Sequence, residues 1–384
     1  MTVYRYDLQT CVRLRNGWTE VNVTGRGNDE PSGTPSLDGV WHAEALPAAL
    51  RSTVGAGLSG AVAGGTRVAW LDPQTGEVGY HGHALASLRG MEPDALAYLL
   101  LTGTRPDAAD ATDSAWAAAR QVMVEAARLP GEVIEWFALT ESRDDPLKVL
   151  RAGLSLVGCA DEEAGSRAES PLPLHAAMRL LGHVAGLVKL RSRRQMGHPL
   201  QREWEANMGL GERLLTESRM LPPTRQEVSL FNDTVLALAD GALTAGAFAG
   251  LVVASCEADW HAAVVAALSG FEGELQWPSA KRESAPDARR DLLREVLHEL
   301  EAMNGPASAR DDAAGQGATL TELGCEALRR LQVAEPLIGC VYVFARSLGL
   351  VSRLYEQSSD NRIYRPLAGY TGPAPRSVAP LAQR

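Results

Sequence analysis

The sequence has few of the patterns that usually mark metal, redox or phosphate sites. Its five cysteines are scattered, with no CxxC pair and no histidine pair beside them. This distribution argues against a zinc site or a disulfide framework and suits a reducing cytoplasm. The GxSxG motif of serine hydrolases and the GxxxxGK(S/T) motif of phosphate loops do not occur. We therefore expect no bound metal and no resident cofactor.

Positive charge and long apolar runs are also scarce. The formal net charge is −10 and the pI is about 5.4, which argues against non-specific binding to nucleic acid or to an anionic membrane. The first residues form no apolar signal region. The most apolar stretch, near residues 245–253, is far shorter than the about 20 residues that span a bilayer. We expect a soluble cytoplasmic protein with no nucleic-acid or membrane partner.

What the chain does contain is helix-forming sequence. Residues 68–80 predict a short β-hairpin, because two Val-containing runs flank the turn Asp-Pro-Gln-Thr-Gly. Residues 1–40 are rich in turn formers and read as a loosely structured lead-in. Further along, apolar residues recur at helical spacing over 95–101, 175–190 and 287–303. The predicted fold class is mainly α-helical, with a short β-hairpin near the N-terminus.

One stretch, residues 243–269, is rich in Gly and Ala. Small side chains at 245, 246, 247, 249 and 250 allow another helix to approach closely. Two interpretations stay open: a buried helix within one subunit, or a helix at an oligomer interface.

The most informative segment is residues 344–372, near the end of the chain. It places Arg346 and Arg365 19 positions apart, the second within a Tyr-Arg-Pro-x-x-x-Tyr-x-Gly run. This layout resembles the C-terminal part of the citrate synthase family. Residues 55–80, 145–158 and 235–276 are similar to further blocks of that family. The resemblance implies a citrate synthase-like fold and a dimer. It also implies that both arginines bind substrate carboxylates, Arg365 in the neighbouring subunit's site.

The residues that the family uses for proton transfer are replaced in this chain. The family's Leu-His-Ala-Asp-His-Glu run falls on residues 237–242, so its two histidines become Leu238 and Gly241. The histidine of its Gly-Pro-Leu-His run becomes Gln276, and the carboxylate of its Asn-Val-Asp-Phe run becomes Thr321. Glutamine does not titrate near neutral pH and threonine is no base. The resemblance therefore implies a site that has lost its acid and base.

The resemblance also implies a division into domains. Residues 1–54 would be the lead-in, and residues 55–275 with 326–384 the large helical domain. Residues 276–325 would be a reduced small domain, because only 45 positions separate Gln276 from Thr321.

Three functions fit these residues. The first is an inactive citrate synthase homologue that acts as a binding or regulatory subunit, in a homodimer or in a heterodimer with an active paralogue. The second is a divergent enzyme that condenses an acyl-CoA, such as acetyl-CoA, with a 2-keto acid. It would use Glu322 or Asp240 as base and Gln276 as enol donor. The third is a sensor of di- or tricarboxylates through Arg346 and Arg365, although both arginines are also compatible with a structural role.

Two other sites can be considered. His81 and His83 with Asp72 or Glu77 have the spacing of one hairpin face, although ordinary surface histidines explain them more simply. The remaining histidines are isolated in the sequence and are expected to be ordinary helix or loop residues: His42, His175, His183, His198, His261 and His298. Residues 55–60 match GxGxxG, but no strand precedes them and Gly64-Gly65 interrupts any helix after them.

Overall fold

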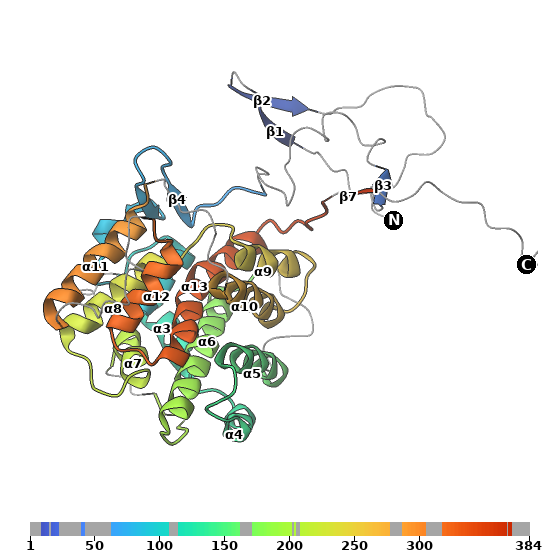
Figure 1. Ribbon diagram of the computed structural model, residues 1–384. Coiled ribbons are helices and arrows are strands. Elements are labelled where there is room, and N and C mark those ends of the chain that lie inside the picture. Colours follow the sequence, from blue (N-terminus) through green and yellow to red (C-terminus); the bar gives the residue numbers. More distant parts are fainter. Residues whose placement is uncertain are drawn as a thin grey trace, which may run out of the picture. The chain divides into compact units, whose positions relative to one another are not determined.

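The computed structural model divides into two compact units (Figure 1). Thr66–Tyr364 form the larger one, and Met1–Gly65 with Arg365–Arg384 form the smaller one. The structure describes residues 9–14, 17–22, 40–42, 63–106, 114–161, 171–201, 203–204, 208–276, 286–304, 317–366 and 368–370. The expected small domain at 276–325 stays a prediction, since much of it lies outside these ranges, as does the GxGxxG run at 55–60.

The smaller unit contains two pairs of strands. β1 (Gln9–Leu14) and β2 (Gly17–Asn22) form an antiparallel hairpin, and β3 (Val40–His42) pairs in parallel with β7 (Ala368–Tyr370). We expected a loosely structured lead-in over residues 1–40, but β1 and β2 are regular strands within it.

The predicted hairpin at residues 68–80 is confirmed. β4 (Ala69–Leu71), β5 (Val78–Tyr80) and β6 (His83–Ala84) form an antiparallel sheet in that order. The Asp72 carboxylate accepts the Gln74 N–H at 2.8 Å, and Gly76 supplies the left-handed conformation that the turn needs, at φ +76°. Tyr80 anchors the sheet to the helices, since its hydroxyl donates to the Leu236 carbonyl at 2.9 Å.

The described remainder of the larger unit is mostly helical, as predicted. A 3₁₀-helix, η2 (Leu85–Leu88), leads into the α-helices. These are α2 (Pro93–Thr102), α3 (Ser114–Ala126), α4 (Gly131–Leu139), α5 (Pro146–Ala160), α6 (Leu174–Met196), α7 (Leu210–Glu217), α8 (Arg225–Leu238), α9 (Ala245–Ser255), α10 (Trp260–Gln276), α11 (Ala288–Asn304), α12 (Leu320–Arg330) and α13 (Glu335–Ser358).

α13 is the core helix of this unit and packs against α2, α5, α6, α8, α9, α10 and α12. Its length and composition would allow it to cross a bilayer, but 94% of its most apolar window is buried by the other helices. The hydrophobic core therefore forms around α13.

The Gly/Ala-rich stretch at 243–269 is two helices and not one, which corrects the expectation. The chain reverses between α9 and α10, where Glu257 adopts a φ of +59°. Gly246 lies against Phe271 and Gly270, and Gly250 against Ala263 and Ala267, so the two helices run antiparallel in close contact. These small residues are used within the chain.

Candidate functional site

Four of the predicted site residues, Leu238, Gly241, Thr321 and Arg346, lie where several helix ends meet α13. The loop 239–244 connects the C-terminal end of α8 to the N-terminal end of α9, and the last turns of α10 lie beside it. Arg346 enters this region from the middle of α13, and its side chain is 5% exposed. The site is therefore built around a buried cation.

The partner of Arg346 is a carboxylate from this same chain. Nη2 of Arg346 lies 3.2 Å from Oε2 of Glu274, on the last turn of α10. The guanidinium also lies over the rings of Phe271 and Tyr342, with its carbon 5.5 and 5.7 Å from their centroids. An anion, two aromatic faces and the buried surroundings therefore hold this arginine.

Besides the Arg346 guanidinium, the N-terminus of α9 also favours a negative charge at the position of Glu274. Its Oε1 accepts the backbone N–H of Gly246 at 3.0 Å, in the first turn of α9. The free N–H groups and the dipole of a helix N-terminus attract negative charge, as does a guanidinium. The Tyr342 hydroxyl lies 3.4 Å from Oε2 and donates to it, and burial raises the pKa of this phenol. Three groups that could bind a free carboxylate therefore bind Glu274.

Two of the three positions where the resemblance expects histidines are Leu238 and Gly241. Leu238 is 1% exposed and packs against Gly324, in the hydrophobic core. Gly241 lies directly against the Arg346 guanidinium, and a Cβ added there would overlap both terminal nitrogens. No side chain at 241, histidine included, fits beside this conformation of Arg346.

Gln276 and Thr321 make contacts that do not point to a reactive centre. The Gln276 amide donates to Glu272 on its own helix at 3.3 Å, and this contact is exposed. Thr321 shares a hydrogen bond of 3.2 Å with the Tyr342 hydroxyl. Thr321 is therefore linked through Tyr342 to Glu274, whereas Gln276 faces its own helix.

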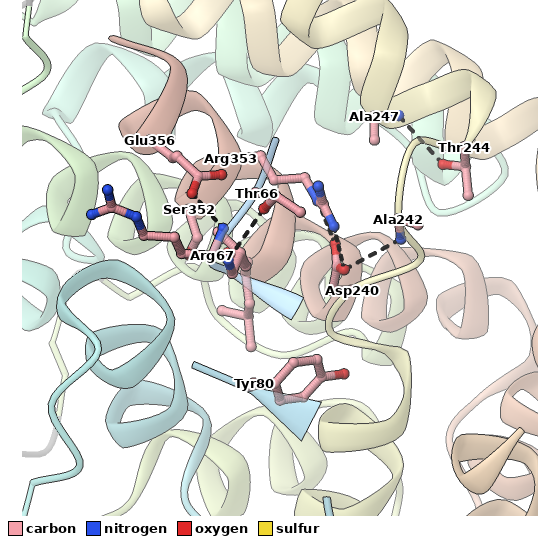
Figure 2. A network of polar contacts seen from close by, with 12 residues as sticks. Thr66, Arg67, Tyr80, Asp240, Ala242, Thr244, Ala247, Ser352, Arg353 and Glu356 are labelled. Carbon is pink, nitrogen blue, oxygen red and sulfur yellow. Dashed lines mark hydrogen bonds and ion pairs between the residues drawn. The ribbon is translucent and has the colours of Figure 1, made fainter. Parts of the chain in front are cut away.

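The two alternative bases are both engaged elsewhere. Glu322 accepts the Thr319 N–H at 2.7 Å and Thr319 receives the Glu322 N–H, a reciprocal capping box that starts α12. Asp240 receives two hydrogen bonds from Arg353, at 2.8 and 2.7 Å (Figure 2). Burial opposes the ionisation of Asp240, but Arg353 outweighs it and the pKa of the carboxyl falls below its usual value. A depressed pKa makes a weaker base.

Figure 2 shows that the Asp240–Arg353 pair belongs to a structural network. Oδ2 of Asp240 also accepts the Ala242 N–H, at 3.3 Å. The Thr244 hydroxyl caps α9 by accepting the Ala247 N–H at 3.4 Å. One turn beyond Arg353, Glu356 accepts the Arg67 N–H at 2.6 Å. The contacts of Asp240 and Thr244 stabilise the loop between α8 and α9, whereas the Glu356–Arg67 contact joins α13 to the segment before β4.

Arg365 is exposed and belongs to the smaller unit. Its pairing with Arg346 in one site therefore stays a prediction.

Of the two histidines at the hairpin, His81 makes a structural contact. The His81 ring lies 2.9 Å from the Leu100 carbonyl at the end of α2, and Asp72 is occupied by its turn. His183 and His261, in contrast, are not isolated as we expected. Their rings meet in the core, with Nδ1 of His183 3.1 Å from Nε2 of His261. Because 78 positions separate them, no local pattern pointed to this pair.

Comparison with known proteins gives a consistent family. Residues 57–283, more than half of the chain, match the family profile described as citrate synthase, C-terminal domain. The citrate synthase of Heyndrickxia coagulans is 24% identical over 378 residues, covering 82% of this chain and 95% of the relative. The 2-methylcitrate synthase of Shewanella oneidensis is 24% identical over 381 residues, covering 87% and 99%.

Solved structures show the same fold. The citrate synthase of Thermotoga maritima superposes with a TM-score of 0.67 at 18% identity and covers 85% of this chain and 98% of that one. The enzyme of Thermoplasma acidophilum, solved as a ternary complex with carboxymethyl coenzyme A and oxaloacetate, superposes with a TM-score of 0.66 at 15% identity. It covers 84% of this chain and 97% of its own length.

Proposed function

Because this chain belongs to the citrate synthase family, we propose that it is a relative that no longer condenses acetyl-CoA with oxaloacetate. It acts instead as a non-catalytic binding or regulatory subunit. The observation that carries this proposal is the ion pair between Arg346 and Glu274, 3.2 Å apart in a nearly buried position. An arginine suited to a substrate carboxylate is neutralised by the chain itself.

The chemistry of such a condensation supports the proposal. A base must remove a proton from the acyl-CoA methyl group, and a donor must stabilise the enolate oxygen that forms. At the positions where the family resemblance expects these groups, the chain has Leu238, Gly241, Gln276 and Thr321. Loss of a general base costs about 10²–10⁴ in rate, and loss of an oxyanion donor a further 10²–10³ or so.

The assembly we propose is a dimer, either of two copies of this chain or with an active paralogue. On α9, the side chains of Phe248, Val252 and Val253 are only partly covered within the chain, as is that of Val265 on α10. Leu243, just before α9, is 42% exposed. An apolar face of this kind is typical of a subunit interface.

The direct test is release of CoA from acetyl-CoA and oxaloacetate by the purified protein, repeated with propionyl-CoA. Arg346→Ala provides the background rate. We expect wild type and variant to release CoA at the same negligible rate. Turnover by the wild type at an ordinary enzymatic rate, lost in Arg346→Ala, would refute the proposal.

The heterodimer version has its own test. Arg365 is the residue that the family resemblance places in the neighbouring subunit's site, and it is exposed. In a mixed dimer with an active paralogue, Arg365→Ala in this chain should lower the turnover of the partner. Unchanged turnover would exclude this role. Arg362→Ala is the matched control, because Arg362 is an exposed neighbour that pairs with Asp360.

A second candidate is a divergent active acyltransferase. One observation favours it: the chain aligns along 95% of the length of the Heyndrickxia coagulans citrate synthase. The contacts of its two possible bases oppose it, because Asp240 is held by Arg353 and Glu322 caps α12. The CoA-release assay separates the two candidates.

A further inference from the structure

A second polar cluster lies in the core, where α5, α6 and α10 meet. His183 is in the middle of α6, His261 in the first turn of α10, and Asp161 directly follows α5. Their side chains are all nearly buried: His183 is 5% exposed as a residue, and the side chains of His261 and Asp161 are 5% and 9% exposed. From this cluster we infer a binding site for a divalent transition-metal ion such as Zn²⁺.

The distances between the ligand atoms fit such an ion. Nδ1 of His183 lies 3.1 Å from Nε2 of His261, and this Nε2 lies 3.8 Å from Oδ2 of Asp161. All three atoms are within 4.8 Å of one another. Zinc–nitrogen bonds of about 2.0–2.1 Å at tetrahedral angles separate ligand atoms by about 3.3–3.4 Å. Two of the separations, 3.1 and 3.8 Å, lie on either side of that value, and the third pair of ligand atoms is within 4.8 Å. Side-chain movements that bring the three atoms around one ion would complete three corners of a tetrahedron.

The orientation of His261 adds a second observation. While its Nε2 faces the cluster, its Nδ1 faces the Asp259 carboxylate, 3.8 Å away. A metal-binding histidine commonly directs its other nitrogen to a carboxylate, which fixes the tautomer and makes the ligand nitrogen more basic. Gly158 on α5 makes room for this arrangement, because a Cβ there would come within 2.9 Å of the His261 side chain.

Charge around the cluster is compatible with a cation. The Arg179 guanidinium lies 3.4 Å from Oδ2 of Asp161 and opposes a metal ion. The two negative charges of Asp161 and Asp259 exceed the single positive charge of Arg179. Burial lowers the pKa of both imidazoles.

The ligand set indicates the class of ion. Two imidazoles and one carboxylate suit Zn²⁺, Co²⁺, Ni²⁺ or Fe²⁺, whereas Mg²⁺ and Ca²⁺ prefer oxygen ligands alone. A water molecule would occupy the fourth position. Such an ion would join the end of α5 to α6 and α10 and stabilise their packing.

The experiment uses the full chain without an affinity tag, stripped with a chelator. Co²⁺ is titrated while the visible absorption of tetrahedral cobalt is followed, and Zn²⁺ is then added to displace it. We expect one Co²⁺ per chain, a tetrahedral spectrum, displacement by Zn²⁺ and a rise in melting temperature with Zn²⁺. Absence of saturable binding, or an octahedral spectrum, would overturn the inference.

Shape-preserving variants identify the ligands. Asp161→Asn and His183→Gln should each weaken Co²⁺ binding by at least about 10–100-fold, the loss typical even for residues that only support a ligand. His175→Gln, exposed on the same helix α6, is the matched control and should bind as wild type does. Equal affinity of all variants would place the ion elsewhere and overturn the inference. If a variant fails to fold, the spectrum and stoichiometry of the wild type decide.

Discussion

The ion pair between Glu274 and Arg346 makes a quantitative prediction. Glu274→Gln removes the charge of the carboxylate but keeps an oxygen that can accept the Gly246 N–H. Arg346 is then a buried guanidinium, 5% exposed, without its counter-ion. The folded protein should therefore lose stability.

The size of the effect follows from burial. Removing one partner of a fully buried ion pair costs about 3–5 kcal/mol. The Glu274 side chain is 18% exposed and the glutamine retains one hydrogen bond, so we expect a loss of about 2–3 kcal/mol.

Urea unfolding at pH 7 measures this loss. Glu295→Gln is the control, because Glu295 is 60% exposed and pairs with Arg89 at the surface. It should change the free energy of unfolding by less than about 1 kcal/mol. The reasoning fails if Glu274→Gln is as stable as wild type.

Three further predictions concern the same region. Gly241→Ala should lower the free energy of unfolding by about 1–3 kcal/mol in urea, because the added methyl group overlaps the Arg346 guanidinium. Asp240→Asn should cost about 3–5 kcal/mol at pH 7, because it leaves Arg353 buried without its charge partner. Because the folded-state pKa of Asp240 is lowered, its contribution is complete above the unfolded value of about 3.9 and is lost as pH falls through the folded value. The wild type should therefore approach the variant in stability only in acid. Thr319→Ala should cost about 1 kcal/mol in thermal melts through loss of a helix cap, with no effect on any CoA release.

The elements that were predictable from the sequence have local signals. The hairpin at 68–80 has a turn that Asp72 and Gly76 specify on their own, and α2 ends at Gly103, which adopts the left-handed φ of +75°. The boundary between α9 and α10 has no such signal. There the left-handed position is taken by Glu257, a residue type that rarely adopts it, so residues 243–269 were read as one helix.

The candidate site was predictable only in part, because its key contacts join distant positions. The resemblance indicated Arg346, but Glu274 is 72 positions away and stands where the family's motif has proline. A replacement of proline by glutamate suggests lost function and does not by itself reveal an ion pair. The pairing of β3 with β7 likewise joins opposite ends of the chain, and such non-local contacts leave no periodic pattern.

The position of Glu274 bears on whether a free carboxylate in solution could reach Arg346. A carboxylate on the same chain, already oriented by α10, is present at an effective concentration of millimolar or more, whatever the metabolic state of the cell. A free di- or tricarboxylate would have to compete with this tethered anion for Arg346. This competition lowers the apparent affinity of the free acid for the arginine. Fluctuations in the level of such acids would therefore leave Arg346 unchanged. Only a partner that also moves the last turn of α10, and Glu274 with it, would make the arginine available.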